Sequence, residues 1–283
     1  MFPLTNIDDW YRTIEYTLGF DTITAYDLIR NYGGGIKSFQ FSQTADDNLY
    51  SNEVYGIYYD IWYDEMCKNN YIVRYGSNNA IRSDKLDLYL KMNNINIKNT
   101  NEYFDYAAKY AVSNYYHNRI SEANSFIGLG VGASSRLQFG SDRETSIWLF
   151  NHPNTDIWME ESKNGHINSK DIYQFPTSIW ISKDIRHWLA NTGAIDNNKF
   201  QKKYNKDLVD IFQKEIIFLI ENNIMEWIDN HLCLVKTKYN YLPHVRMLFT
   251  NDFYLKKILE LNNNPDYLKT LRFERSLHDR KGT

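Results

Sequence analysis

The sequence predicts an α/β protein with two portions: residues 1–150 alternate strands and helices, and residues 151–283 are mostly helical. In the first portion, short β-branched or apolar runs alternate with stretches whose apolar residues recur every three or four positions. In the second portion the helical spacing dominates, and a hairpin signal follows it. Alternating strands and helices favour parallel βα units. The first portion holds too few such units to close an eightfold barrel, so we expect an incomplete one.

The elements of the first portion follow in chain order. Thr5 is suited to cap a helix that ends at Gly19, because the apolar residues between them have helical spacing. Later stretches with the same spacing predict two more helices, and β-branched or apolar runs predict the strands. The helices are expected at residues 52–70 and 100–116, and the strands at residues 21–29, 71–75 and 125–131.

The second portion is predicted to hold helices at residues 158–163, 177–191 and 205–222. The last of these has the most regular apolar spacing in the chain. Two short apolar runs, residues 224–228 and 232–235, then flank Asp229 and Asn230, a pair typical of a hairpin turn. Helices followed by a hairpin indicate a winged-helix-like module.

Composition limits the classes of partner and compartment. The formal net charge of −3 provides no overall basic field, so a nucleic-acid partner is not expected. The longest purely apolar run, Ile216–Ile220, is far too short to span a membrane. The first ten residues have neither a basic start nor an apolar signal segment. Two cysteines, Cys67 and Cys233, do not form a disulfide framework, and a reduced cytoplasmic protein is expected.

The segment Phe126–Ser135, FIGLGVGASS, is a strand-like run with glycines at every second position from Gly128 to Gly132. Such backbone either ends a buried strand in a tight turn or approaches a ligand closely. It lacks the acidic residue of a dinucleotide fingerprint and the lysine of a phosphate loop. In either interpretation a side chain at Gly130 would cost contact or force an unfavourable φ, so Gly130→Val is expected to destabilise the fold by about 1–3 kcal/mol, the usual cost of overpacking.

The histidines, cysteines and acidic residues predict neither a catalytic group nor a metal site. No histidine pair has the spacing of a known metal motif. His231 and Cys233 would share one face of a strand, but two ligands do not make a site. Cys67 lies among apolar neighbours of a predicted helix, which favours a buried thiol over a nucleophile.

The order of several short motifs resembles a known family. His117-Asn118 stands shortly before the glycine-rich segment Gly128–Ala133, the strand Thr22–Leu28 precedes both, and Val235–Phe249 follows near the end of the chain. In this order the chain resembles the later part of the oxygen-independent coproporphyrinogen III oxidase and heme chaperone family, which are radical S-adenosylmethionine (SAM) proteins. The sequence departs from the family at Lys238–Asn240, where a Lys-Gly-Arg turn is expected.

The resemblance implies a partial radical-SAM-type βα barrel followed by the winged-helix-like module. It also implies a role in heme biosynthesis or heme handling, with a tetrapyrrole as the ligand. Members of the family bind a [4Fe-4S] cluster and S-adenosylmethionine, and they line the latter with strand ends. Carried over to this sequence, the cofactor-binding positions are Tyr26, Ile29, Gly128, Gly130, Val131, Ala133 and Ser134.

The cluster motif of that family, CxxxCxxC, is absent from this chain. A cluster needs thiolate ligands, so no cofactor is expected in the chain alone, and it is expected to lack radical activity. It would then be a truncated or decayed product, or a half whose partner is the missing N-terminal half. Whether the chain is an enzyme stays open. The alternatives are a cluster-free tetrapyrrole-binding protein and a winged-helix interaction module.

Overall fold

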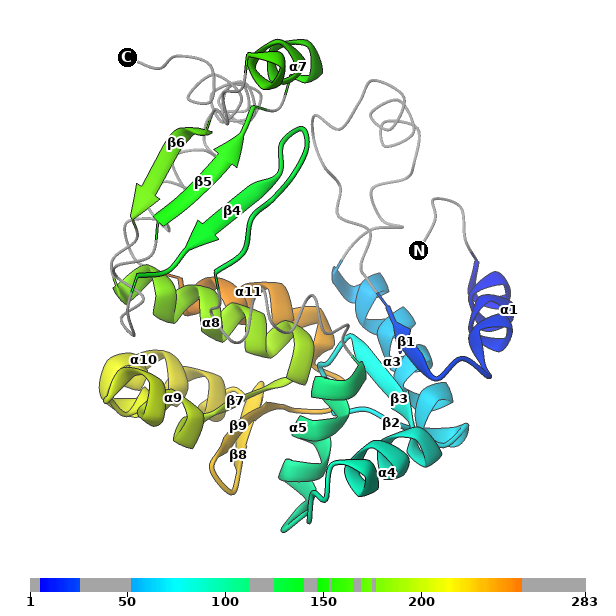
Figure 1. The fold of residues 1–283 in the computed structure, drawn as a ribbon. Helices are drawn as coiled ribbons and strands as arrows, with labels where there is room; N and C mark the ends of the chain where they lie inside the picture. Colours follow the sequence, from blue (N-terminus) through cyan, green and yellow to red (C-terminus); the bar gives the residue numbers. More distant parts are fainter. Residues whose placement is uncertain are drawn as a thin grey trace. The chain divides into compact units, whose positions relative to one another are not determined.

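The structure, a computed structural model, describes residues 6–25, 52–111, 125–139, 147–152, 154–164, 169–174 and 177–250 (Figure 1). The chain forms two compact units, and each is considered by itself. The described residues of the first unit are 6–25, 52–111 and 183–250, and those of the second are 125–139, 147–152, 154–164, 169–174 and 177–182. The predicted domain boundary at residue 150 stays a prediction. The described residues form a mixture of helices and sheets, and the partial barrel and the winged-helix-like module stay predictions.

The first sheet of the first unit is antiparallel. It has the order β1 (Thr22–Thr24), β3 (Asn79–Arg82) and β2 (Tyr71–Ile72), with Thr22 opposite Ile81 and Tyr71 opposite Arg82. The predicted parallel pairing is therefore not found among the described strands. The reason is the short connection between β2 and β3, because parallel neighbours need a crossover of a dozen or more residues.

Three of the four described helices around this sheet lie at predicted positions, and the one at Ser83–Met92 was not predicted. The four helices are α1 (Ile7–Thr17), α3 (Asn52–Lys68), α4 (Ser83–Met92) and α5 (Thr100–Ala111). The N-cap of α1 is Asn6 rather than Thr5, and its side chain and that of Asp9 each accept the other's backbone N–H. The indole of Trp10 donates to the Tyr58 carbonyl at 2.9 Å and so joins α1 to α3.

A small apolar core joins α4 and α5 to β3. It contains the buried side chains of Ile81, Leu86, Leu90, Ala107 and Ala111. Removing such side chains from water is the main favourable contribution to folding, at roughly 25 cal/mol per Å² of apolar surface. The cluster therefore anchors the strand that lies in the middle of the sheet.

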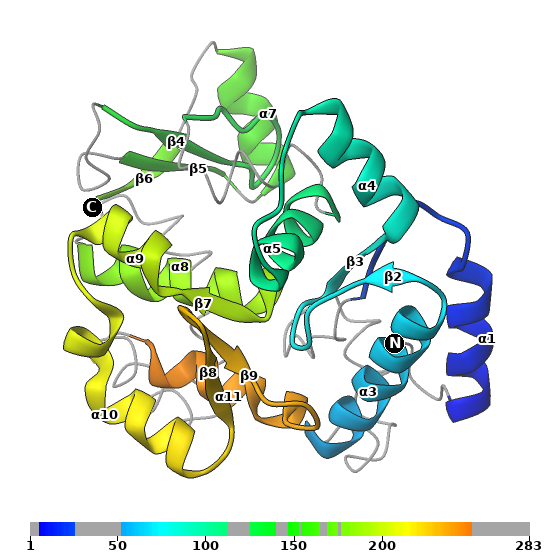
Figure 2. The same ribbon diagram turned by 90° about the horizontal axis from the view of Figure 1, so that it is seen from below.

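The second sheet of the first unit has the order β7 (Ala194–Asp196), β9 (His231–Leu234) and β8 (Met225–Ile228), again antiparallel. Strands β8 and β9 confirm the predicted hairpin, and Asp229 in its turn has a φ of 52°. Three helices accompany the sheet (Figure 2): α8 (Thr177–Thr192), α9 (Asn197–Tyr204) and α10 (Leu208–Glu221). A short 3-10 turn, Tyr239–Tyr241, and α11 (Leu242–Leu248) follow.

The helix predicted at residues 205–222 begins later, at Leu208, and a separate helix precedes it. Asn205 has a left-handed backbone, with a φ of 51°, and ends α9. Asp207 then caps α10 by accepting the N–H of Val209 at 2.8 Å. A left-handed residue followed by a capping aspartate separates two helices that apolar spacing alone does not separate.

The residues between β2 and β3 cap the C-terminal end of α8. The guanidinium of Arg74 donates to the Thr192 carbonyl at 3.2 Å. The Ser77 hydroxyl donates to the Asn191 carbonyl at 2.5 Å, and the Asn78 N–H donates to the Ala190 carbonyl at 3.1 Å. The last carbonyls of a helix lack partners within the helix, so these donors satisfy groups that would otherwise be buried without hydrogen bonds.

The second unit contains an antiparallel sheet of β4 (Ser134–Leu137), β5 (Ile147–Asn151) and β6 (Ser169–Gln174), in that order, and the helix α7 (Thr155–Lys163). Arg136 on β4 is 1% exposed, and its guanidinium lies 5.5–5.8 Å from the ring centroids of Phe126, Trp148 and Trp180. Stacking on these rings stabilises the buried cation.

The strand predicted at residues 125–131 is not a strand in the structure. Within it only Phe126 forms a bridge, with Arg136, and regular pairing begins at Ser134. Gly130 and Gly132 have φ values of 103° and 64°, which an extended strand does not allow. Within the described residues, no helix is long and apolar enough to cross a membrane.

Replacing Gly193 by alanine should destabilise the first unit. Its φ of 67° is left-handed, and an added Cβ would overlap the carbonyl oxygen of Tyr75. Together these predict a loss of about 2–5 kcal/mol in the free energy of unfolding. Gly19→Ala is the control, because Gly19 also has a positive φ, 108°, but nothing lies within 4 Å of its added Cβ. Urea denaturation of both variants measures the difference, and equal losses would contradict the close approach.

The stability of the fold should fall as the pH drops from about 6.5 to about 4. Burial lowers the pKa of His187 on α8 to about 4, and this lowering is opposed in part by Asp184. An unfolded histidine has a pKa of about 6.5, so within this window the unfolded chain binds a proton that the folded chain does not. Comparing urea midpoints at several pH values should show a weaker dependence in His187→Gln. An unchanged pH profile would assign the dependence to other groups.

Candidate functional site

The structure describes five of the seven predicted cofactor-binding residues, and these five are neighbours in the sequence. Gly128, Gly130, Val131, Ala133 and Ser134 lie in one segment of the second unit, which leads into β4. The other two, Tyr26 and Ile29, are outside the described residues, so their proximity to this segment stays a prediction.

Hydrogen bonds from the end of β5 hold the glycine segment in place. The side-chain amide of Asn151 donates to the carbonyls of Gly128 and Gly130, at 3.2 and 2.8 Å. The Gly132 N–H donates to the His152 carbonyl at 3.1 Å, and the Asn151 N–H donates to the Ala133 carbonyl at 2.8 Å. Asn151 is therefore the residue that shapes the segment.

The first two glycines of this segment are needed for different reasons. A Cβ on Gly128 would overlap the backbone oxygen of Ser134, so this position is a close approach of two backbones. Gly130 has nothing within 4 Å of an added Cβ, and its requirement is the φ of 103°. Of the two reasons expected for a loss at Gly130, the unfavourable φ agrees with the structure, whereas the close contact is found at Gly128 instead.

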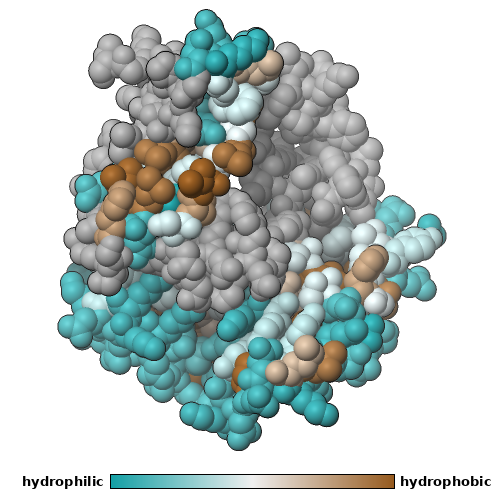
Figure 3. All heavy atoms as spheres, viewed as in Figure 1, coloured by the Kyte–Doolittle hydropathy of each residue, from teal (hydrophilic) through white to brown (hydrophobic). Residues whose placement is uncertain are grey.

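The residues on either side of Gly128 and Gly130 have apolar, exposed side chains. Ile127 is 70% exposed, Leu129 is 87% exposed and Val131 is 39% exposed. Figure 3 shows hydrophobic residues gathered over the part of the surface formed by the β4–β6 sheet. The segment has no titratable side chain of its own, so it can offer apolar contact but no acid–base chemistry.

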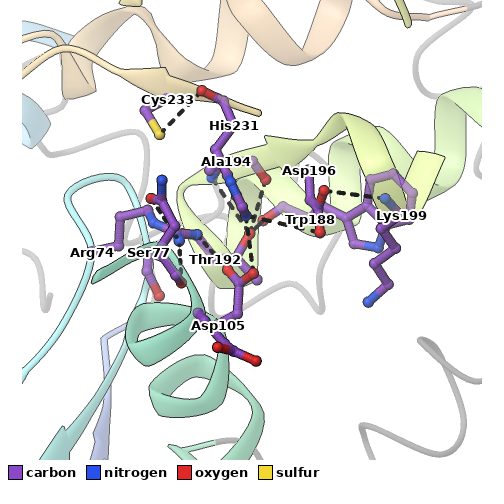
Figure 4. Close-up of polar contacts among 12 residues, drawn as sticks. Arg74, Ser77, Asp105, Trp188, Thr192, Ala194, Asp196, Lys199, His231 and Cys233 are labelled. Carbon is purple, nitrogen blue, oxygen red and sulfur yellow. Dashed lines mark hydrogen bonds and ion pairs between the residues drawn. The ribbon is translucent and has the colours of Figure 1, made fainter. Parts of the chain in front are cut away.

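The first unit contains a polar cluster of Arg74, Asp105 and His231 that the sequence patterns do not predict (Figure 4). Arg74, which follows β2, donates to the carboxylate of Asp105 on α5 at 2.8 Å. The second oxygen of Asp105 lies 3.0 Å from Nε2 of His231 at the start of β9. Arg74 also donates to the carbonyl of Asn101 at 2.9 Å, one turn before Asp105 on α5.

The cluster alters the titration of its carboxylate and of a neighbouring thiol. Burial raises the pKa of Asp105, but the His231 hydrogen bond and the positive charge of Arg74 outweigh burial and leave the pKa below its usual value. Burial also raises the pKa of the Cys233 thiol to about 11, so it stays protonated at neutral pH. Cys233 is consequently not an activated nucleophile.

The sequence predicted only one feature of this polar cluster. His231 and Cys233 were expected to share a strand face, and the Cys233 thiol does lie 3.7 Å from the His231 carbonyl. His231 contacts Asp105, which lies 126 positions earlier in the chain, and Asp105 in turn contacts Arg74. No spacing motif connects residues so far apart.

Gly128→Ala should destabilise the protein more than Gly130→Ala. The first substitution forces the backbone of Ser134 to move, at about 1–3 kcal/mol, whereas the second meets only the conformational cost of a positive φ, about 1 kcal/mol. Chemical denaturation of the two single variants checks the order. A larger loss at Gly130 would show that its open side is occupied in solution.

The sequence matches no protein-family model and none of the curated proteins to which it was compared. Among solved structures, the fold is similar to that of coproporphyrinogen III oxidase (HemN) from Escherichia coli, a radical SAM enzyme. The TM-score is 0.52 at 12% sequence identity, over 88% of this chain and 52% of that chain. This chain thus spans about half the length of that enzyme, and at this identity the likeness is one of fold.

Proposed function

We propose that this chain binds a tetrapyrrole and does not carry out radical chemistry by itself. The observation that carries the proposal is the fold similarity to a coproporphyrinogen III oxidase over 88% of the chain. That enzyme is named for its porphyrinogen substrate, and a shared fold raises the expectation of a related ligand without proving it. The side chains that the fold presents must therefore supply the contacts for the ligand.

The number and environment of the cysteines argue against a [4Fe-4S] cluster in the chain alone. A [4Fe-4S] cluster of the radical SAM type is held by three cysteine thiolates, and this chain has two cysteines. Cys233 on β9 is buried, whereas Cys67 on α3 is exposed and not buried as expected. Desolvation by the surrounding protein still raises the pKa of both thiols. Neither environment favours the thiolate form that a cluster needs.

The apolar glycine segment is the proposed contact for the macrocycle. Ile127, Leu129 and Val131 project from backbone that is held by Asn151, and glycines without side chains separate them. Exposed apolar side chains on a fixed backbone suit a flat apolar ring, because little conformational freedom is lost on binding.

A titration with heme and with coproporphyrin III tests the proposal. The wild-type chain should give a saturable shift of the Soret band, and Leu129→Asp should weaken binding by about tenfold or more, which corresponds to about 1.4 kcal/mol. Ile217→Asp is the matched control, since Ile217 is also an exposed apolar residue but lies on α10. Absence of a shift, or equal weakening in both variants, would contradict a ligand contact at this segment.

Anaerobic reconstitution with iron and sulfide tests the second half of the proposal. The purified chain should retain no near-stoichiometric iron and sulfide, because its thiolates are too few. A stable four-iron cluster on the chain alone would overturn this half and leave the tetrapyrrole titration unaffected.

A winged-helix-like interaction module is the second candidate. The element order α8, β7, α9, α10, β8, β9 and the sheet order β7-β9-β8 support it. Helix α10 has three acidic residues and one lysine in its sequence LVDIFQKEIIFLIE, and it exposes Ile217, Phe218 and Ile220. An acidic, apolar face favours a protein partner over nucleic acid. Salt-dependent binding of a DNA duplex in a fluorescence anisotropy titration would contradict this assignment.

A further inference from the structure

Three potential metal-ligand atoms converge in the first unit, and they come from three different elements (Figure 4). They are Oδ2 of Asp105 on α5, Oδ2 of Asp196 at the end of β7, and Nε2 of His231 at the start of β9, all within 4.8 Å of one another. Nε2 lies 3.0 Å from the first oxygen and 3.9 Å from the second.

The second oxygen of each carboxylate is held by another group. Arg74 donates to Oδ1 of Asp105 at 2.8 Å. The backbone N–H of Lys199 donates to Oδ1 of Asp196 at 3.1 Å, because Asp196 is the N-cap of α9. These contacts orient the remaining oxygens toward the imidazole, as the outer partners of metal ligands do.

Burial and charge favour a cation at this point. His231 is 8% exposed, and its Nδ1 is buried without a hydrogen-bond partner, so the ring is enclosed by protein. The side chains of Asp105 and Asp196 are 35% and 25% exposed, which leaves a path from solvent. With a neutral imidazole, two carboxylates and the guanidinium of Arg74 leave one net negative charge.

We propose that Asp105, Asp196 and His231 bind a divalent first-row metal ion, with Zn²⁺ as the ion that fits best. One imidazole and two carboxylates are ligands that Zn²⁺ accepts, and bonds of about 2.0–2.2 Å in a tetrahedron place ligand atoms about 3.3–3.6 Å apart. The distances from Nε2 of His231 to the two carboxylate oxygens, 3.0 and 3.9 Å, bracket that value, and all three atoms lie within 4.8 Å of one another. Three protein ligands leave a fourth position for water or a substrate.

The competing interpretation is an ion pair between a protonated His231 and Asp105. That pair needs neither Asp196 nor an open coordination position, since Asp196 is 3.9 Å from the ring nitrogen. A metal site requires Asp196, whereas the ion pair tolerates its neutral isostere. Asp196→Asn therefore distinguishes the two, and asparagine retains the oxygen that caps α9.

Equilibrium dialysis of the purified chain against Zn²⁺ tests the proposal. Wild type should bind one ion saturably, and Asp196→Asn should lower the affinity at least about tenfold, since even outer partners of metal ligands change it by about 10–100-fold. Asp207→Asn is the matched control, because Asp207 caps α10 in the same way and should keep wild-type affinity. With Co²⁺ as the probe, visible absorption bands should appear in wild type and in the control only.

His231→Gln provides a second variant in case Asp196→Asn does not fold, with folding checked by far-UV circular dichroism. It should also lose the saturable Zn²⁺ binding and the Co²⁺ bands. Absence of saturable binding in wild type would overturn the proposal. Binding that survives in the folded variants would also overturn it, because the ion would then be held by other residues. Neither outcome depends on tetrapyrrole binding, so this site and the proposed function fail independently.

Discussion

The capping of α8 by the residues between β2 and β3 is the interaction on which the first unit depends. The helix ends with three carbonyls, Ala190 to Thr192, that have no partners within it, and the donors from Arg74, Ser77 and Asn78 satisfy them. A buried polar group left without a partner costs about 1–3 kcal/mol, so the two segments stabilise each other strongly. Gly193 permits the contact, because no side chain fits between it and Tyr75.

The same contact determines where the polar cluster forms. It fixes Arg74 beside the end of α8, and from there the guanidinium reaches Asp105. The chain continues from Gly193 directly into β7, which pairs with β9 and brings Asp196 opposite His231. The candidate metal site is therefore a consequence of how one helix ends, and it requires no local motif.

Local patterns explain which parts of the fold could be predicted. Helices α1, α3 and α8 and the β8–β9 hairpin follow from apolar spacing, capping and turn residues, all within a few positions of one another. The strand β3 was missed because the only apolar residues among Asn79–Arg82 are the adjacent Ala80 and Ile81, which give no alternating pattern. The antiparallel pairing of β1 with β3 joins residues more than 50 positions apart, and nothing local specifies it.

The two candidate sites also differ in how far the sequence predicts them. The glycine segment could be recognised in the sequence because its glycines recur at every second position, although its irregular backbone depends on Asn151 and was not predicted. The polar cluster could not be predicted from the sequence, because its residues lie close together only after folding. These residues are Arg74, Asp105, Asp196 and His231.

The fold of this chain is similar to that of a radical SAM enzyme at only 12% identity, because a fold depends less on particular residues than a reaction does. A fold needs apolar patterns, helix caps and a few glycines, and many sequences supply these. An iron–sulfur cluster needs cysteine thiolates at particular positions, and apolar patterns or helix caps cannot replace these ligands. The chemistry of this chain must therefore be decided from its own side chains. Those side chains separate into an apolar segment in one unit and a charged cluster in the other, so a flat apolar ligand and a metal ion would not compete for the same residues.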